Sequence, residues 1–335
     1  MDKVKLRVNT LCSGIGAQER GIENTGLFDL DVVATSEINK DAVLAYAAIH
    51  NGLTNEIVEN YKDYPSLDEM RQYLTDINLG YEPEKGKRYD WYKSGKKFET
   101  NIKKYWLACK LNKNLGDINR VEELPEADLW TLSFPCQSIS VAGKLRGLDP
   151  DSGTRSSLIW QTIRLLRKAQ ETNTLPKYMM MENVKNLVGK RFIKDFETFN
   201  SLIEEFNYNT YWKVINAKDT GVPQNRERVF AIHIRKDIDT GNFTFPIPFD
   251  NGLRLKDILD ENVDESYYIN TEKAQQLIQK LLDDGVIGDE PSRAEPIDLS
   301  IKNARSIEFA NCVSARTDRG ISNRQAEGSG VCELQ

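Results

Sequence analysis

The sequence is poor in the residues that bind metals or cross-link secreted proteins. It has two histidines, His50 and His233, and five scattered cysteines without CxxC spacing. Neither a zinc centre nor a disulfide framework is therefore expected. No secretory leader is expected, and no apolar run reaches the roughly 18 residues that a membrane span needs. We expect a cytoplasmic protein with no metal and no membrane contact.

Positive charge is not in excess either, since the formal net charge is −6. Bulk electrostatics therefore do not predict a protein that coats nucleic acid, and any such contact must be local. Three basic stretches are candidates, at residues 85–88, 93–104 and 185–194. A stretch of this kind is more often a solvated charged face than a binding surface.

The apolar pattern predicts an α/β protein. Strands are expected at residues 4–11, 31–36, 128–133, 178–181, 208–216 and 228–235. Helical spacing is seen at residues 18–24, 41–50, 156–171 and 192–206. The alternation of strand and helix implies a mostly parallel, doubly wound, Rossmann-like sheet.

Two regions depart from this alternation. Residues 51–112 are rich in tyrosine and lysine and poorly periodic, which predicts an insertion with short helical patches. From residue 237 the composition changes to prolines and charged stretches, with one short helix over 271–282. We therefore expect a first domain over residues 1–236 and a smaller second region over 237–335.

A glycine loop follows the first predicted strand. Gly14 and Gly16 let the backbone approach a ligand closely, and the next helix offers free amides. Glu37 ends the second strand about 20 residues later, where it can accept hydrogen bonds from ribose hydroxyls. This pattern predicts a ribose-bearing cofactor and leaves nicotinamide and S-adenosylmethionine both open.

Cys136 follows the predicted strand over 128–133 and lies on a short loop behind Pro135. Reacting groups in open α/β sheets lie where such strands end, and proline stiffens the turn. A lone free cysteine is commonly an inert buried residue, however. Its position alone therefore does not make Cys136 a nucleophile.

Four ordered motifs resemble those of the DNA cytosine carbon-5 methyltransferases of the phage and bacterial restriction-modification type. They are Leu11-Cys12-Ser13-Gly14-Ile15-Gly16-Ala17, Phe134-Pro135-Cys136-Gln137, Met181-Glu182-Asn183-Val184 and Gln224-Asn225-Arg226-Glu227-Arg228. The resemblance implies a Rossmann-like, S-adenosylmethionine-dependent methyltransferase fold that acts on a cytosine flipped out of duplex DNA. One departure is Cys12, where the family usually has an aromatic residue.

The resemblance also implies roles. Cys136 would add to carbon 6 of the ring as a thiolate, and Glu182 would donate a proton or hydrogen bond at nitrogen 3. Arg226 and Arg228 lie two apart, so on an extended segment they point to one face, towards the active site. Cofactor contacts are expected from Ser13, Gly14, Ile15, Gly16, Glu37, Ile38, Asp117, Ile118 and Pro135. Positioning of the loop or base is expected from Gln137, Ser140 and Asn183.

Each role has a plainer alternative. Glu182 could cap a helix or pair with a surface lysine, Asp117 could be a helix cap, and the two arginines could be surface charge. The family's closing Gly-Asn-Ser motif has no match after residue 230, and residues 309–324 resemble part of a target-recognition region. We therefore expect a partial recognition region, and a chain that is truncated or needs a C-terminal partner subunit and by itself binds cofactor and methylates weakly.

Three other functions remain open from the sequence. An RNA cytosine-5 methyltransferase would share Cys136 and Glu182, although the region after residue 237 favours duplex DNA. A nicotinamide oxidoreductase would explain Gly14, Gly16 and Glu37 only. A non-catalytic DNA-binding remnant would keep the fold without turnover.

Overall fold

The computed structural model describes residues 2–83, 85–135, 158–260, 264 and 272–285, and four two-residue strands between 297 and 332. Its contacts divide the chain into two compact units. The first unit comprises Met1–Lys213 and Val229–Phe243, and the second comprises Val214–Arg228 and Thr244–Gln335. The functional division expected at residue 236 stays a prediction.

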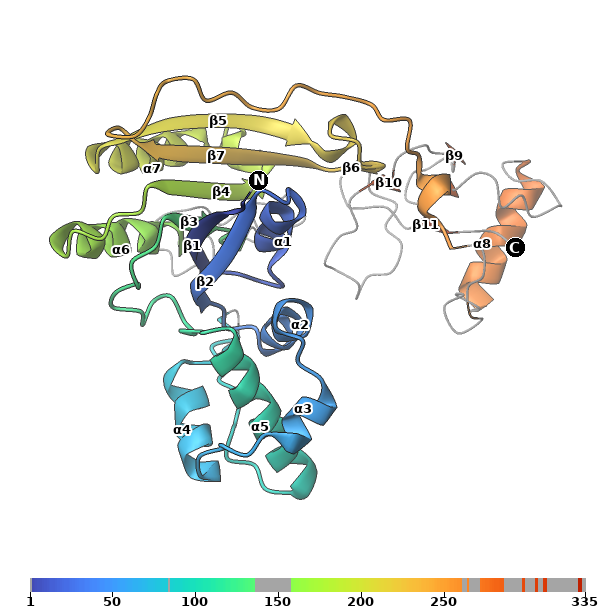
Figure 1. Cartoon of the computed structure of the whole chain (residues 1–335). Helices are drawn as coiled ribbons and strands as arrows, with labels where there is room; N and C mark the ends of the chain where they lie inside the picture. Colours follow the sequence, from blue (N-terminus) through green and yellow to red (C-terminus); the bar gives the residue numbers. More distant parts are fainter. Residues whose placement is uncertain are drawn as a thin grey trace. The chain divides into compact units, whose positions relative to one another are not determined.

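A six-stranded sheet with the order β2-β1-β3-β4-β7-β5 organises the fold (Figure 1). Its strands are β1 (Val4–Leu11), β2 (Phe28–Ser36), β3 (Leu129–Leu132), β4 (Tyr178–Val184), β5 (Tyr208–Asn216) and β7 (Glu227–Arg235). The pairs β1–β2, β1–β3 and β3–β4 are parallel. The predicted Rossmann-like α/β architecture is thereby confirmed.

The middle of the sheet is buried on both faces. All four residues of β3 are buried, as expected for a parallel strand covered on both sides. In β4 the burial alternates, with Met179, Met181 and Asn183 buried and Glu182 half-buried on the other face. The strand also continues to Val184, so the expectation that it ends at Met181 is wrong. Glu182 and Asn183 therefore belong to the strand and point to opposite faces.

Helices follow the strands as predicted in the first unit. They are α1 (Ala17–Asn24), α2 (Lys40–Asn51), α6 (Ile159–Glu171) and α7 (Ile193–Glu205). The start of α2 is capped by Asn39, whose side chain accepts from the amides of Asp41 and Ala42. None of the described helices is both long enough and apolar enough to span a lipid bilayer.

The insertion expected over residues 51–112 is a packed helical layer. It contains α3 (Asn55–Asn60), α4 (Leu67–Asp76) and α5 (Lys96–Leu111). Leu74, Trp91 and Ile102 are at most 2% exposed and belong to one apolar cluster that also includes residues of α2. The expectation of short helical patches is wrong for α5, a 16-residue helix. Its regular spacing is hard to see in the sequence because its last two turns are buried on nearly every side.

The second unit contains short elements. These are β6 (Gln224–Asn225), β8 (Ile297–Asp298), β9 (Arg305–Ser306), β10 (Ala310–Asn311), β11 (Val331–Cys332) and α8 (Glu272–Asp283). β6 pairs with β10 in parallel, and β8 pairs with β9 and β11 in antiparallel fashion. The predicted helix over 271–282 is confirmed as α8. Short 3₁₀ helices cover Lys185–Val188 in the first unit, and Ala217–Asp219 and Leu255–Ile258 in the second.

Candidate active site

The sequence-predicted residues of the first unit gather where the parallel strands end. Cys12 follows β1, Glu37 follows β2, Phe134 and Pro135 follow β3, and Glu182 lies near the end of β4. The carboxyl edge of an open α/β sheet is where ligands bind. These residues therefore lie at the carboxyl edge of the sheet, and that they form one site stays a prediction.

Asn183 connects two of the motifs directly. Its side-chain Nδ2 donates to the carbonyl oxygen of Phe134 at 3.0 Å, and its Oδ1 accepts from the amide of Val184 at 2.9 Å. Asn183 is 3% exposed and Phe134 is 6% exposed, so water competes little for this bond. The end of β4 therefore holds the backbone two residues before Cys136.

Gln18 provides a second link to the same loop, one that the sequence interpretation did not identify. This α1 side chain donates to the Leu132 carbonyl oxygen at 3.4 Å and to the Ser133 hydroxyl. The Ser133 amide also donates to the Leu11 carbonyl oxygen at 3.2 Å. The glycine loop and the loop after β3 are thus joined at their bases. The residue type gave no clue, because Glu19 and Arg20 in the same turn of α1 are also polar.

The Glu37 carboxylate is held by backbone amides. Its Oε2 accepts from the Gly14 amide at 3.0 Å, and its Oε1 accepts from the Asn39 amide at 2.7 Å. A carboxylate has about four lone-pair sites and can accept hydrogen bonds from several donors at once. Glu37 thereby joins the glycine loop to the start of α2.

Asn114 is a further residue that the sequence interpretation missed. Its Oδ1 accepts from the amides of Glu37 and Gly116, and its Nδ2 donates to the Glu37 carbonyl oxygen, at 3.0, 3.2 and 3.0 Å respectively. This buried side chain therefore fixes Glu37 and the Gly116-Asp117 turn relative to each other. Its position two residues before Gly116 was the available sequence clue.

Asp117 is buried and already well bonded. Its Oδ2 accepts from Asn78 Nδ2 at 2.7 Å, and its Oδ1 accepts from the amide and the side chain of Asn119 at 3.0 and 2.8 Å. Asp117 does not cap an α-helix, because none begins there. The neighbouring Ile118 is 4% exposed. The adenine contact expected of Asp117 would have to use the remaining lone pairs of its carboxylate.

Cys12 lies among these groups with an unusual backbone conformation. Its φ is 55°, in the left-handed region that favours glycine. Desolvation, and then the charges of Glu37 and Asp117, raise the pKa of the Cys12 thiol far above its usual range. Cys12 therefore stays a neutral thiol at neutral pH. The carboxylates of Glu37 and Asp117 both lie close enough to raise its pKa.

The glycine loop has room for a ligand on one side only. A Cβ atom built on Gly14 would meet nothing within 4 Å, whereas one built on Gly16 would lie 2.2 Å from His50 Nε2. Gly16 also precedes α1 without a side-chain cap, so the first-turn amides are not capped from that residue. Ser13 and Ile38 are half-buried here, and Ile15 is 50% exposed. These residues leave open space beside Gly14, where the sequence predicts a ribose-bearing cofactor.

Arg226 and Arg228 belong to the second unit. The Arg226 amide donates to Asn216 Oδ1 at 3.0 Å, and its carbonyl oxygen accepts from the Ala217 amide at 3.0 Å. Arg226 and Arg228 are half-buried. Asn225, before them, and Glu227, between them, are exposed. This alternation agrees with two side chains on one face. Their orientation towards the active site stays a prediction.

Three predicted residues lie outside the described part of the chain, namely Cys136, Gln137 and Ser140. Pro135 is the last described residue before them and is half-buried. Glu182 is half-buried, and its role as a donor stays a prediction. Among the described residues, no group of three or more His, Cys, Asp or Glu side chains is arranged to hold a metal ion.

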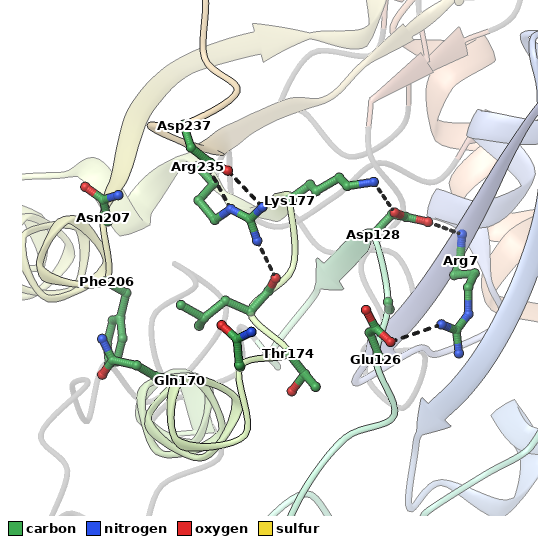
Figure 2. A pocket seen from close by; sticks show the side chains of 13 residues that line it. Arg7, Glu126, Asp128, Gln170, Thr174, Lys177, Phe206, Asn207, Arg235 and Asp237 are labelled. Atoms are coloured by element: carbon green, nitrogen blue, oxygen red, sulfur yellow. Dashed lines mark hydrogen bonds and ion pairs between the residues drawn. The ribbon is translucent and has the colours of Figure 1, made fainter.

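A cavity of about 560 Å³ lies at the opposite edge of the sheet (Figure 2). Lys177 Nζ pairs with Asp128 Oδ1 at 2.8 Å, where β3 and β4 begin. Arg235 forms two hydrogen bonds to the Asp237 carboxylate, at 2.7 and 3.0 Å. The Lys177 hydrogen bond lowers the pKa of Asp128, as expected for a stabilised carboxylate. These ion pairs leave little net charge for a ligand, so we interpret the cavity as structural.

Comparisons with known proteins identify the family of this chain. The family model described as "C-5 cytosine-specific DNA methylase" matches residues 66–316. The Type II methyltransferase M2.ScrFI of Lactococcus lactis subsp. cremoris is 42% identical over 266 residues, which is 79% of this chain and 70% of that protein. The Orphan methyltransferase M.SssI of Spiroplasma monobiae is 34% identical over 233 residues, or 68% of this chain and 59% of that protein.

Solved structures share the fold. The Entamoeba histolytica methyltransferase EhMeth has a TM-score of 0.51 at 15% identity and covers 96% of this chain and 74% of its own. A triple mutant of Spodoptera frugiperda DNMT2 has a TM-score of 0.51 at 19% identity and covers 95% of this chain and 72% of its own. The fold and the gathered motifs define a Rossmann-like methyltransferase. The chain belongs to the C-5 cytosine-specific DNA methylase family.

Proposed function

We propose that this chain methylates carbon 5 of cytosine in duplex DNA, with S-adenosylmethionine as methyl donor. The hydrogen bond from Asn183 to the Phe134 carbonyl oxygen carries the proposal. It joins the motif that contains Glu182 to the loop that leads to Cys136. The proposed mechanism needs Glu182 and Cys136 at one ring, and this buried contact between their two motifs supports that requirement. Family membership favours this activity over a nicotinamide oxidoreductase and gives the RNA alternative no added support.

Carbon 5 of cytosine is a poor nucleophile until the ring becomes electron-rich. In the proposed mechanism the Cys136 thiolate adds to carbon 6, and Glu182 donates at nitrogen 3 as negative charge develops there. Arg226 and Arg228 hold the ring carbonyl oxygen or the DNA backbone with planar donors. Ser140 and Gln137 keep the loop and the flipped base in position. When bound, S-adenosylmethionine supplies an electrophilic methyl group.

The proposed cofactor site is formed by the residues around Glu37. We propose that Glu37 accepts from the ribose hydroxyls and that Asp117, beside Ile118, accepts from the adenine amino group. Ile38 covers the adenine ring, and Ser13 to Gly16 and Pro135 line the rest of the site. The open space beside Gly14 supports this assignment, because a ligand can approach that backbone without meeting a side chain.

Trapping with 5-fluorocytosine tests the proposal. The full chain is mixed with S-adenosylmethionine and duplex DNA that carries 5-fluorocytosine in random contexts. We expect an adduct that survives denaturant and that Cys136→Ala abolishes, while Cys109→Ala, a control thiol variant in α5, still forms it. Adduct formation on tRNA in place of duplex DNA would contradict the DNA assignment. No adduct on any substrate would contradict catalysis by this chain alone.

Duplex DNA is the proposed partner, and so the proposed place of action is the cytoplasm of a bacterial or phage-infected cell. The chain spans 70% of M2.ScrFI and 59% of M.SssI. A need for a C-terminal partner subunit is tested by co-expression with the part of M2.ScrFI outside the alignment. An adduct that forms only under co-expression would establish that need.

A further inference from the structure

A strong local positive charge lies in the helical insertion, away from the predicted catalytic residues in sequence. Residues 85–104 contain eight lysine and arginine residues and only two acidic residues, although the whole chain has a net charge of −6. Lysine and arginine side chains at this density repel one another, so some gain must offset the repulsion. Favourable binding of a polyanionic partner would offset this repulsion.

Most of these cations are exposed and without a carboxylate partner. Six of them are exposed and form no ion pair within the described residues: Lys87, Arg88, Lys93, Lys96, Lys97 and Lys103. We call these six residues the basic surface. Lys85, in contrast, pairs with Glu82. Unpaired cations keep their full charge for an external anion.

The basic surface has two parts, the segment before α5 and the exposed face of α5, and aromatic contacts join them. Lys93 Nζ lies 5.9 Å from the centre of the Tyr89 ring, and this ring stacks on Phe98 with a centroid distance of 6.2 Å. Phe98 lies in the first turn of α5, directly after Lys97. Lys96 and Lys103 are seven residues apart on that helix, so they lie on one face. The segment before α5 and the exposed face of α5 therefore form a continuous surface.

The base of this surface is rigid. Trp91 is 2% exposed, and its Nε1 donates to the Leu79 carbonyl oxygen at 3.1 Å. Its ring contacts Tyr105 of α5 edge-on at 5.3 Å between centroids. A rigid base presents the lysines without the cost of ordering a flexible loop on binding. Tyr92 adds a 54% exposed ring beside them.

We propose that the basic surface binds the phosphate backbone of duplex DNA outside the methylated site, without reading its sequence. This inference rests on the proposed function, because that activity brings duplex DNA to the chain. Separate lysine point charges spread over an exposed face suit a row of phosphates better than one small anion, which needs converging donors. Such a contact would keep the enzyme on DNA between target sites.

Binding to a dA·dT duplex tests the surface without the target base. The dissociation constant of the full chain is measured over a range of salt concentrations by fluorescence anisotropy. For Lys96→Gln/Lys97→Gln we expect about tenfold weaker binding and a log–log salt slope smaller by about 1.8, since each phosphate contact contributes roughly 0.9. The control Lys3→Gln/Lys236→Gln removes the same charge from exposed positions elsewhere and is expected to keep the wild-type slope.

Three outcomes would overturn the proposal. They are no binding of the wild-type chain at low salt, an equal slope for the α5 variant and the wild type, or binding of polyglutamate but not of duplex. Adduct formation on 5-fluorocytosine DNA is scored separately with the same variants. If the wild-type chain forms no adduct but the α5 variant still lowers the salt slope, the proposed function is contradicted and the basic surface is not.

Discussion

The side-chain amide of Asn183 donates to the carbonyl oxygen of Phe134 at 3.0 Å and ties β4 to the loop that leaves β3. Alternation along β4 explains the pairing, because Asn183 faces the interior while Glu182 faces the other side. Two adjacent residues thus have separate tasks. Asn183 bonds to the backbone two residues before Cys136, and the donor role proposed for Glu182 would act from the opposite face of β4.

Asn183→Ala tests this positioning role. Its loss leaves a buried carbonyl oxygen without a donor, which costs about 1–3 kcal/mol of stability. If the loop shifts by an ångström, kcat falls by roughly 100-fold. Asn200→Ala is the matched control, since Asn200 is also buried but lies on α7. Equal kcat values for the two variants, measured on duplex DNA, would contradict the role of Asn183.

Two glycines of one loop are expected to respond differently to alanine. At Gly16, with φ 81°, the new methyl group would collide with His50 and with the buried Tyr46 ring. At Gly14, with φ 55°, it meets no atom within 4 Å, so the cost is limited to backbone strain of roughly 1–2 kcal/mol.

We therefore expect Gly16→Ala to lower the melting temperature more than Gly14→Ala does. Gly14→Ala should instead weaken binding of S-adenosylhomocysteine, because its methyl group enters the open space proposed for the cofactor. Differential scanning calorimetry and isothermal titration calorimetry measure the two effects. Wild-type affinity in a folded Gly14→Ala variant would argue against the proposed cofactor site.

His233 makes stability depend on pH. Burial lowers the pKa of His233 from 6.5 to about 3, so the folded chain keeps it neutral. Below pH 6.5 the unfolded chain binds a proton that the folded chain does not. Stability is therefore full above that pH and falls on acidification by about 1.4 kcal/mol per pH unit. Urea unfolding between neutral pH and mild acid measures the slope.

His233→Gln is expected to remove this slope, and His50→Gln to retain it. The chain has no other histidines, so the pair of variants isolates the effect. The same decline in both variants would assign it to carboxylates.

Glu19 acts in the opposite pH direction. Glu19 is 1% exposed. Burial raises the pKa of Glu19, although the Thr10 hydroxyl and His50 act to lower it. Such an acid does not destabilise the folded chain when the pH is below the pKa of the acid in the unfolded chain. The folded chain loses stability as the pH rises from that value towards the pKa in the folded chain.

Glu19→Gln should therefore stabilise the chain at neutral pH, because the substitution removes a buried charge that has no such cost in the unfolded chain. Urea unfolding at neutral and acidic pH compares it with Glu23→Gln, a partly exposed control on the same helix. The gain should disappear in acid. A destabilised Glu19→Gln variant at neutral pH would contradict this prediction.

The sequence by itself determined the order of strands and helices, because apolar periodicity and turn residues are local properties. It also determined the motif residues, which match the family in order and residue type. β4 shows the limit of local patterns, since its strand continues through the polar residues Glu182 and Asn183. Only pairing with neighbouring strands supports an extended backbone there.

The tertiary structure decided which residues support the site. Gln18 and Asn114 act through bonds to segments more than 70 residues away along the chain, so no local pattern reveals them. The packed insertion around Trp91 likewise depends on contacts among α2, α4 and α5. Residue types and their spacing therefore specify the chemistry, whereas the support of that chemistry arises from long-range packing, which burial and hydrogen bonding select only in the folded chain.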